Sequence, residues 1–223
     1  MKNKVLIKEI FASIQGEGPY IGYEQLFIRF SNCNLNCKYC DTDFSSNLQE
    51  YSAIELYEEI KKYKNIHSIS LTGGEPLLDI DFLQELLPTI NKKVYLETNG
   101  TLYENLKKII TYIDIISMDI KLNSTSNNGD LFTTHEKFIQ IAIENQKEIF
   151  AKVVFDENIT EQEIKECTNL AQKYNIQIIL QPKMDAEILN ISSEKIYMIF
   201  NKFINIYGNV RLIPQVHKFL NVR

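Results

Sequence analysis

Three of the four cysteines in this 223-residue chain lie in one short segment, "SNCNLNCKYCDTDF" (31–44). Cys33, Cys37 and Cys40 have the spacing C-x3-C-x2-C, whereas Cys167 lies far away in an amphipathic segment that favours a small buried side chain. Thiolates grouped in this way suit an iron–sulfur cluster or zinc. A structural zinc site usually takes four ligands in two separated pairs, and candidates for a fourth ligand are scattered here. A four-iron cluster on three thiolates keeps one iron open and reactive, so we favour the cluster, with a zinc-stabilised binding module as the alternative.

The composition is that of an ordinary globular protein. Hydrophobic residues make up 44% of the chain and charged residues 24%, and the net charge is −5. The apolar patch at the amino end is broken by Lys8 and Glu9, and it is too short for a signal peptide or a membrane span. We therefore expect a cytoplasmic protein with reduced thiols and no membrane contact. The acidic balance and the absence of a basic run argue against a nucleic-acid partner.

Short apolar runs alternate with segments of helical period. The predicted strands are 25–30, 67–73, 93–99, 114–121, 149–155, 176–182 and 209–215, and the clearest predicted helices are 52–63 and 160–174. Three helix starts carry a capping-box pattern, namely Ser52 with Glu55, Thr101 with Glu104, and Thr160 with Glu163. This alternation predicts an α/β fold with a mostly parallel sheet of about six strands, too few for a closed eight-fold barrel. We expect one domain over 1–223, an open β/α barrel preceded by an amino-terminal segment of about 24 residues that forms an added hairpin.

Polar residues and glycines recur where the predicted strands end. The carboxyl ends of parallel strands share one edge of the sheet, and that edge is where such folds place their chemistry. The ends comprise Arg29 with the cysteines, 72–76, 97–100, 117–121, 152–156, 181–183 and 214–217. The sequence therefore predicts that these residues surround one site.

Two motifs at this edge resemble those of a known superfamily. The cysteine spacing with Tyr39 before the last thiol, and "TGGEP" (72–76) after the next strand, resemble the signature of radical S-adenosylmethionine (SAM) enzymes. The resemblance implies a 4Fe-4S cluster on Cys33, Cys37 and Cys40. It also implies that SAM is split to a 5′-deoxyadenosyl radical, which takes a hydrogen atom from the substrate. The SAM contacts that it implies are Tyr39, Cys40, Asp41, Gly73, Gly74, Glu75, Ser117, Met118, Asp119 and Gln181. For Gly73 and Gly74, we expect the missing Cβ atoms to allow close approach to the methionine part of SAM.

Three further stretches narrow the resemblance. "FASIQGEGPYIG" (11–22), "CDT" (40–42) and "VRLIPQVHKFLNVR" (210–223) together resemble the 7-carboxy-7-deazaguanine synthase family of the queuosine pathway. This resemblance implies conversion of 6-carboxy-5,6,7,8-tetrahydropterin to 7-carboxy-7-deazaguanine with ring contraction and loss of ammonia. An activase of glycyl-radical enzymes, with a similar cysteine spacing, is the alternative within the superfamily.

The same resemblance implies a set of site residues and partners. Thr42 would bind Mg²⁺ through its hydroxyl oxygen, the ligand type that this ion prefers. Arg29, one of three arginines in the chain, would grip the substrate carboxylate with its planar fork. The other implied substrate contacts are Ile14, Gln15, Gly16, Glu17, Thr72 and Arg223. We further expect a homodimer and an electron donor such as a flavodoxin or a ferredoxin. The polar segment 122–130 matches nothing in the pattern.

Overall fold

The fold is built on one large, mostly parallel sheet. The computed structural model describes residues 3–40, 46–185 and 188–222. Within them, nine strands follow the spatial order β11-β8-β7-β6-β5-β4-β2-β1-β3, and a separate small hairpin pairs β9 with β10. The strands are β1 (Lys4–Ile14), β2 (Glu24–Phe30), β3 (Gln49–Ser52), β4 (Ser68–Gly73), β5 (Val94–Thr98), β6 (Ile115–Asp119), β7 (Glu148–Phe155), β8 (Gln177–Pro182), β9 (Met184–Asp185), β10 (Ile188–Leu189) and β11 (Val210–Leu212).

The direction of the strands confirms the predicted α/β class. From β2 through β4, β5, β6, β7 and β8 to β11, each neighbouring pair is parallel. The amino-terminal strand β1 runs antiparallel to β2 and to the short strand β3. The first two dozen residues were expected to form a hairpin of their own, but their strand β1 pairs instead with β2, the first parallel strand, and with β3, and so extends the sheet.

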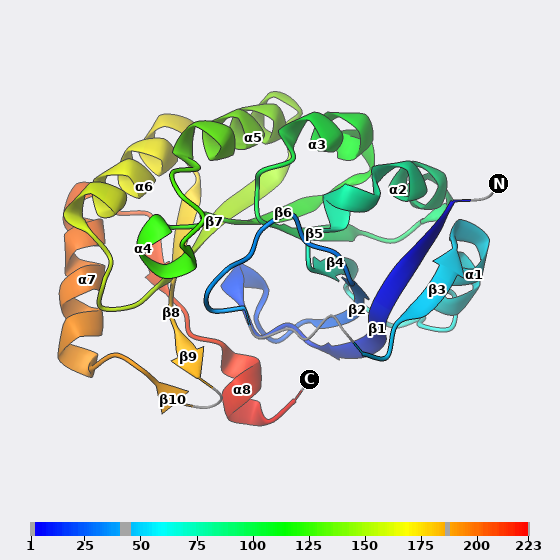
Figure 1. Ribbon diagram of the computed structural model, residues 1–223, viewed down its shortest axis with the longest axis horizontal. Coiled ribbons are helices and arrows are strands. Elements are labelled where there is room, and N and C mark those ends of the chain that lie inside the picture. Colours follow the sequence, from blue (N-terminus) through cyan, green and yellow to red (C-terminus); the bar gives the residue numbers. More distant parts are fainter. Residues whose placement is uncertain (1–2, 41–45, 186–187, 223) are drawn as a thin grey trace.

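The described part of the chain forms eight α-helices. They are α1 (Ala53–Ile60), α2 (Ile80–Leu86), α3 (Tyr103–Ile109), α4 (Asn123–Ser126), α5 (Phe132–Glu144), α6 (Glu161–Tyr174), α7 (Ser193–Ile206) and α8 (Val216–Leu220). Short 3₁₀ turns cover Gly18–Tyr20, Pro76–Asp79, Leu87–Thr89 and Ile110–Tyr112. Figure 1 shows α2, α3, α5, α6 and α7 following one another along an outer arc, with the strands on its inner side. No helix in the described part of the chain has both the length and the apolar character that a membrane span requires.

Two of the three predicted capping boxes are present. Ser52 and Glu55 cap α1 reciprocally, and Thr160 and Glu163 do the same for α6. The third prediction was wrong, because α3 begins at Tyr103 without a side-chain cap. The Thr101 hydroxyl instead donates to Asn99 Oδ1 at 2.5 Å, so this side chain is taken up by the strand-end loop.

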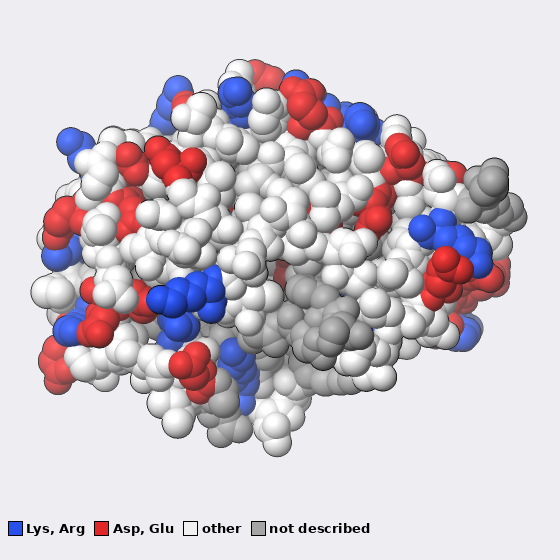
Figure 2. All heavy atoms as spheres, in the orientation of Figure 1, with Lys and Arg blue, Asp and Glu red and all other residues white. Residues whose placement is uncertain are grey.

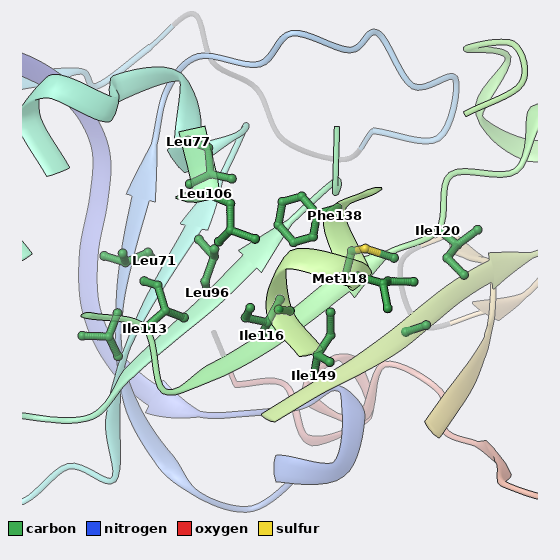
Figure 3. Packing of buried hydrophobic residues seen from close by; sticks show 14 of the residues in the cluster. Leu71, Leu77, Leu96, Leu106, Ile113, Ile116, Met118, Ile120, Phe138 and Ile149 are labelled. Atoms are coloured by element: carbon green, nitrogen blue, oxygen red, sulfur yellow. The ribbon is translucent and has the colours of Figure 1, made fainter. Parts of the chain in front are cut away.

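The main hydrophobic core lies between the sheet and the outer helices. Leu71, Leu96 and Ile116 come from three adjacent strands and are fully buried with Leu106 and Phe138 of α3 and α5 (Figure 3). Cys167 is also fully buried in this core, as predicted, and burial raises the pKa of its thiol well above the usual value. A second cluster packs on the inner face of the sheet, with Tyr95, Ile115, Phe150, Ile179 and Ile213. Tyr20, in the turn Gly18–Tyr20, packs against this inner cluster and closes the amino-terminal end of the strands.

Candidate functional site

A cavity of about 440 Å³ opens at the carboxyl ends of the parallel strands. Such strand ends are the usual place for a site in parallel α/β folds. The lining residues are Glu17, Arg29, Cys33, Leu35, Asn36, Cys37, Tyr39, Cys40, Thr72, Gly73, Gly74, Glu97, Thr98, Asn99, Asp119, Lys121, Lys152, Val154, Gln181, Lys183, Met184, Gln215 and Lys218. On the molecular face in Figure 2, acidic and basic side chains are interspersed among uncharged ones.

The three clustered cysteines line one wall of this cavity. Cys33 and Cys40 are exposed and Cys37 is half-buried, while a turn joins the last two by a hydrogen bond from the Cys40 N–H to the Cys37 carbonyl at 3.0 Å. Partial burial raises the pKa of Cys33 and Cys37, and the Lys121 ammonium acts in the opposite direction on both. A cation beside the thiols favours their ionised, ligating form.

The thiol arrangement suits a cluster better than a single ion. Among the described residues, no three His, Cys, Asp or Glu side chains converge closely enough to hold one metal ion. A four-iron cluster places each thiolate on a different iron, so its ligands need not converge on a point. Three thiols from one loop, all facing a cavity that can also admit an organic ligand, fit such a cluster.

The glycines of the "TGGEP" motif fix the start of the cysteine loop. A Cβ atom on Gly73 would lie 2.3 Å from the Phe30 carbonyl oxygen, and one on Gly74 would lie 2.0 Å from the Asn32 carbonyl oxygen. Gly73 also has a φ of 116°, which glycine adopts without strain. The backbone N–H of Gly74 donates to Phe30 at 3.0 Å. Both glycines thus allow close approach of the chain that leads into Cys33, and their approach to the methionine part of SAM stays a prediction.

A half-buried carboxylate lies between the predicted substrate residues. Glu97, at the end of β5, accepts hydrogen bonds from Thr72 Oγ1 at 2.8 Å and from Gln15 Nε2 at 3.0 Å. Gln15 is itself fixed by Gln25 and lies behind the cavity wall, with 2% of its surface exposed. The amino-terminal segment therefore reaches the cavity through the Glu97 carboxylate, which sequence reasoning placed at a strand end without a role.

A chain of paired charges crosses the cavity wall. The Lys152 ammonium contacts Glu17 and also Asp119 Oδ1, the latter at 3.1 Å. Asp119 is paired with Lys121 Nζ at 2.7 Å, and Lys121 also donates to the Tyr39 hydroxyl at 3.2 Å. Asp119 and Lys121 come from the end of β6, Lys152 from β7, Glu17 from the amino-terminal turn and Tyr39 from the cysteine loop, so these contacts link four segments.

The pKa values of Glu17, Lys121 and Lys152 reflect their ion pairs. Burial raises the pKa of Glu17, but the Lys152 ammonium and a hydrogen bond from Gln215 outweigh it and lower the value from 4.5 to about 2. Burial lowers the pKa of Lys152 and Lys121, and the adjacent carboxylates outweigh it and raise both. Glu17, Lys121 and Lys152 are therefore charged near neutral pH.

Gln181 carries an unsatisfied acceptor at the cavity. This β8 residue is 3% exposed and lines the cavity, and its Oε1 atom has no hydrogen-bond partner among the described residues. A buried amide oxygen without a donor is costly. The residues present therefore fit a ligand with N–H or O–H groups, such as SAM, seated beside the thiols.

The structure brings only part of the predicted site together. Of the predicted site residues, those that line the cavity are Cys33, Cys37, Cys40, Tyr39, Gly73, Gly74, Asp119, Gln181, Glu17, Arg29 and Thr72, and their contacts with ligands stay predictions. The Ser117 side chain is hydrogen-bonded to the buried Tyr95, and Met118 is fully buried in the main core. Neither side chain lines the cavity. Glu75 is fully buried and accepts from Thr98 and from the N–H groups of Leu77 and Asn99.

The remaining predicted residues lie beside the cavity or outside the described residues. Ile14 ends β1 and is 38% exposed on the hairpin. Gly16 lies against α8, where its carbonyl accepts from Val216 N–H at 2.9 Å and a Cβ atom would lie 2.4 Å from His217 Nδ1. Asp41, Thr42 and Arg223 fall outside the described residues.

Comparisons with known proteins identify the family of this chain. The family model of the Radical SAM superfamily matches residues 27–180. A "7-carboxy-7-deazaguanine synthase" of Geobacter sulfurreducens is 37% identical, with 96% of each chain covered, and one of Archaeoglobus fulgidus is 34% identical, with 96% of this chain and 97% of the relative covered. The solved structure of QueE from Escherichia coli shares the fold, with a TM-score of 0.66 at 20% identity over 96% of this chain and 95% of that one. The chain belongs to the radical SAM superfamily and, within it, to the 7-carboxy-7-deazaguanine synthase family.

Proposed function

We propose that this cavity converts 6-carboxy-5,6,7,8-tetrahydropterin to 7-carboxy-7-deazaguanine, with ring contraction and loss of ammonia. The observation that carries the proposal is the shared cavity, in which three cysteines face Arg29, Thr72 and Glu97. Similarity to the synthases over nearly the whole chain supports the same reaction. The queuosine pathway uses such a product.

Membership of the superfamily implies a 4Fe-4S cluster and SAM. Together they supply, when bound, a carbon-centred radical that abstracts a hydrogen atom from the substrate. Cys33, Cys37 and Cys40 would hold the cluster. Asp119, which lines the cavity, would accept hydrogen bonds from ribose hydroxyls, and Gln181 would offer its amide oxygen, which has no partner among the described residues, to a ligand N–H or O–H. Tyr39 is placed to contact the adenine ring from the cysteine loop.

The opposite part of the cavity suits a carboxylated pterin. Arg29 pairs with Glu9, Nε to Oε2 at 3.4 Å, which leaves the rest of its fork for the substrate carboxylate. Glu97 is held by Thr72 and Gln15, so its carboxylate is oriented to accept from ring N–H groups. Glu17 adds a second charged acceptor. These groups are ordered within the folded chain, which lowers the cost of orienting the substrate.

Several finer features belong to the same proposal. Thr42 supplies a hydroxyl oxygen to Mg²⁺, and Asp41 and Arg223 complete the SAM and substrate contacts, respectively. The chain acts as one radical SAM domain whose first 24 residues bind substrate. It works as a homodimer in the cytoplasm, where its free thiols stay reduced, and takes electrons from a flavodoxin or a ferredoxin.

The deciding experiment is a product assay. Anaerobically reconstituted protein is incubated with 6-carboxytetrahydropterin, SAM, Mg²⁺ and a reductant, and 7-carboxy-7-deazaguanine is measured by mass spectrometry. Cysteine-to-alanine variants at 33, 37 and 40 serve as controls that should lose both SAM cleavage and product. SAM cleavage without any deazaguanine product would refute the proposal and favour the glycyl-radical activase. One zinc and no iron would favour the binding module.

A further inference from the structure

The polar segment 122–130, which the sequence pattern leaves without a role, docks on the cysteine loop. Its first half forms α4, and Asn127 ends that helix in the left-handed conformation with a φ of 62°. The Ser126 carbonyl accepts from the Lys38 N–H at 3.1 Å, next to Cys37. The Asn36 N–H, on the other side of Cys37, donates to Asn128 Oδ1 at 3.3 Å. The backbone on both sides of this cysteine is thus held by one segment.

The Asn128 amide also contacts the thiol itself. Its Nδ2 atom donates to Cys37 Sγ at 3.2 Å and to the Ser126 carbonyl at 3.4 Å. A backbone N–H can only donate, so the Asn36 N–H requires the amide oxygen on its side. The amide nitrogen must then face the sulfur, and the direction of the N–H···S bond follows from its neighbours.

The segment is rigidly attached to the rest of the fold. The Thr125 hydroxyl donates to the Val154 carbonyl at 3.2 Å, and the Ser124 N–H donates to Glu163 Oε1 at 2.9 Å. Asn123 Oδ1 closes the loop by accepting from the Gly129 N–H at 2.9 Å. Asn128 is half-buried, and its position is therefore set by strand β7 and helix α6.

We propose that Asn128 is a positioning residue for the cluster, which holds the Cys37 thiolate and stabilises the reduced cluster through its N–H···S bond. The inference rests on Cys37 being a cluster ligand, as in the proposed function. Reduction adds negative charge to the cluster and its sulfurs, and a hydrogen bond donated to a ligand sulfur favours the more negative state. The amide therefore makes the cluster easier to reduce.

The test compares cluster potentials in reconstituted variants by redox titration with electron paramagnetic resonance. Asn128→Asp retains an acceptor for the Asn36 N–H but offers no donor to the sulfur, so docking is kept while the N–H···S bond is lost. Asn128→Ala removes both contacts. At a fixed solution potential we expect the ratio of reduced to oxidised cluster to fall about threefold to tenfold in Asn128→Ala. This change is smaller than the full effect of a hydrogen bond to a charged group, because the oxidised and the reduced cluster are both anionic and both accept the bond. The fall should be larger in Asn128→Asp, since it adds a negative charge.

Asn123→Ala is the matched control, because it breaks a hydrogen bond within the segment and the described contacts place no cysteine on it. Its potential should stay near that of the unaltered protein. Equal potentials in the unaltered protein and both Asn128 variants would overturn the inference, as would equal shifts in Asn123→Ala and Asn128→Ala. Absence of an iron cluster from the unaltered protein would overturn it too. A lower cluster potential in the Asn128 variants, with no deazaguanine product from the unaltered protein, would support the inference and reject the proposed function.

Discussion

Among the charged residues that line the cavity, Lys152 should contribute most to the free energy of unfolding. The substitution Lys152→Met tests this prediction. Its side chain is 8% exposed, and it bridges Glu17 and Asp119, which are 17% and 20% exposed. Methionine retains the length of the apolar stem but removes the ammonium. Two carboxylates would then remain in a poorly hydrated place with one cation fewer.

The expected loss of stability in Lys152→Met depends on the contacts that Glu17 and Asp119 keep. Removing one partner of a buried ion pair costs about 3–5 kcal/mol, because the other charge stays uncompensated. Asp119 keeps the Lys121 ammonium at 2.7 Å, and Glu17 keeps a hydrogen bond from Gln215 at 2.8 Å. We therefore expect the lower end, about 3 kcal/mol, which lowers Tm by about 6–12 °C in a chain of this size.

The assay is urea unfolding of the cluster-free protein near pH 7, with Lys173→Met as the matched control. Lys173 is paired with Glu136 at 2.6 Å but is 62% exposed, so its loss should change the stability little. Adding Glu17→Gln to Lys152→Met should recover part of the loss, because the uncompensated charge is removed.

The pH dependence gives a second check on the same residue pair. The folded-state pKa of Glu17 is lowered from 4.5 to about 2, so this group contributes stability above 4.5 and loses it as the pH falls toward 2. Protonated Glu17 does not need the cation, and the difference between the two proteins should shrink over that window. A loss in Lys152→Met no larger than that in Lys173→Met, or a difference that grows on acidification, would refute the pairing argument.

Three further substitutions separate the roles of neighbouring groups. Gly74→Ala should lower iron content and thermal stability, because its Cβ would lie 2.0 Å from the Asn32 carbonyl oxygen. Gly208→Ala, with open space around the added Cβ, should change neither, and equal effects of the two substitutions would reject the close-approach argument. Arg29→Lys should raise the KM for the pterin far more than it changes uncoupled SAM cleavage, since lysine cannot form two parallel bonds to a carboxylate, and equal effects on both would assign Arg29 to the fold. Thr42→Ala should weaken the Mg²⁺ dependence of product formation while iron content stays intact, and an unchanged Mg²⁺ response would exclude Thr42 as a ligand.

The fold and the main part of the site were predictable because both depend on local pattern. Apolar β-branched runs separated by helical segments predict parallel strands, and parallel strands bring their carboxyl ends to one edge. Arg29, Thr72, Asp119 and Gln181 reach one cavity for this reason alone. The cysteine loop needed only its own spacing.

The place of a residue at a strand end was not enough to predict whether its side chain lines the cavity. Ser117, Met118 and Asp119 are consecutive on β6, and side chains on a strand alternate between its two faces. Asp119 faces the cavity, so Met118 must face the helices, where it is fully buried. Alternation alone predicts that the Met118 side chain points away from the cavity. Glu75 shows a different limit, since no local pattern reveals that the N–H groups of Leu77 and Asn99 turn toward its carboxylate.

Several polar contacts of the cavity join distant segments of the chain. Lys152 and Glu17 are 135 residues apart, and Gln15 and Glu97 are 82 apart, so no window of sequence links them. A lysine inside the apolar run "IFAKVVF" was nevertheless a signal, because an unpaired charge is rarely left on a buried strand. Glu17, Asp119, Lys121 and Lys152 are thus paired in the folded chain before any ligand enters. Such preorganised groups need little rearrangement when a substrate arrives, which is how oriented charges contribute to catalysis. The stability contributed by Lys152 and the orientation of Glu17 and Asp119 therefore have the same physical origin, and a variant that loses the first should also lose the second.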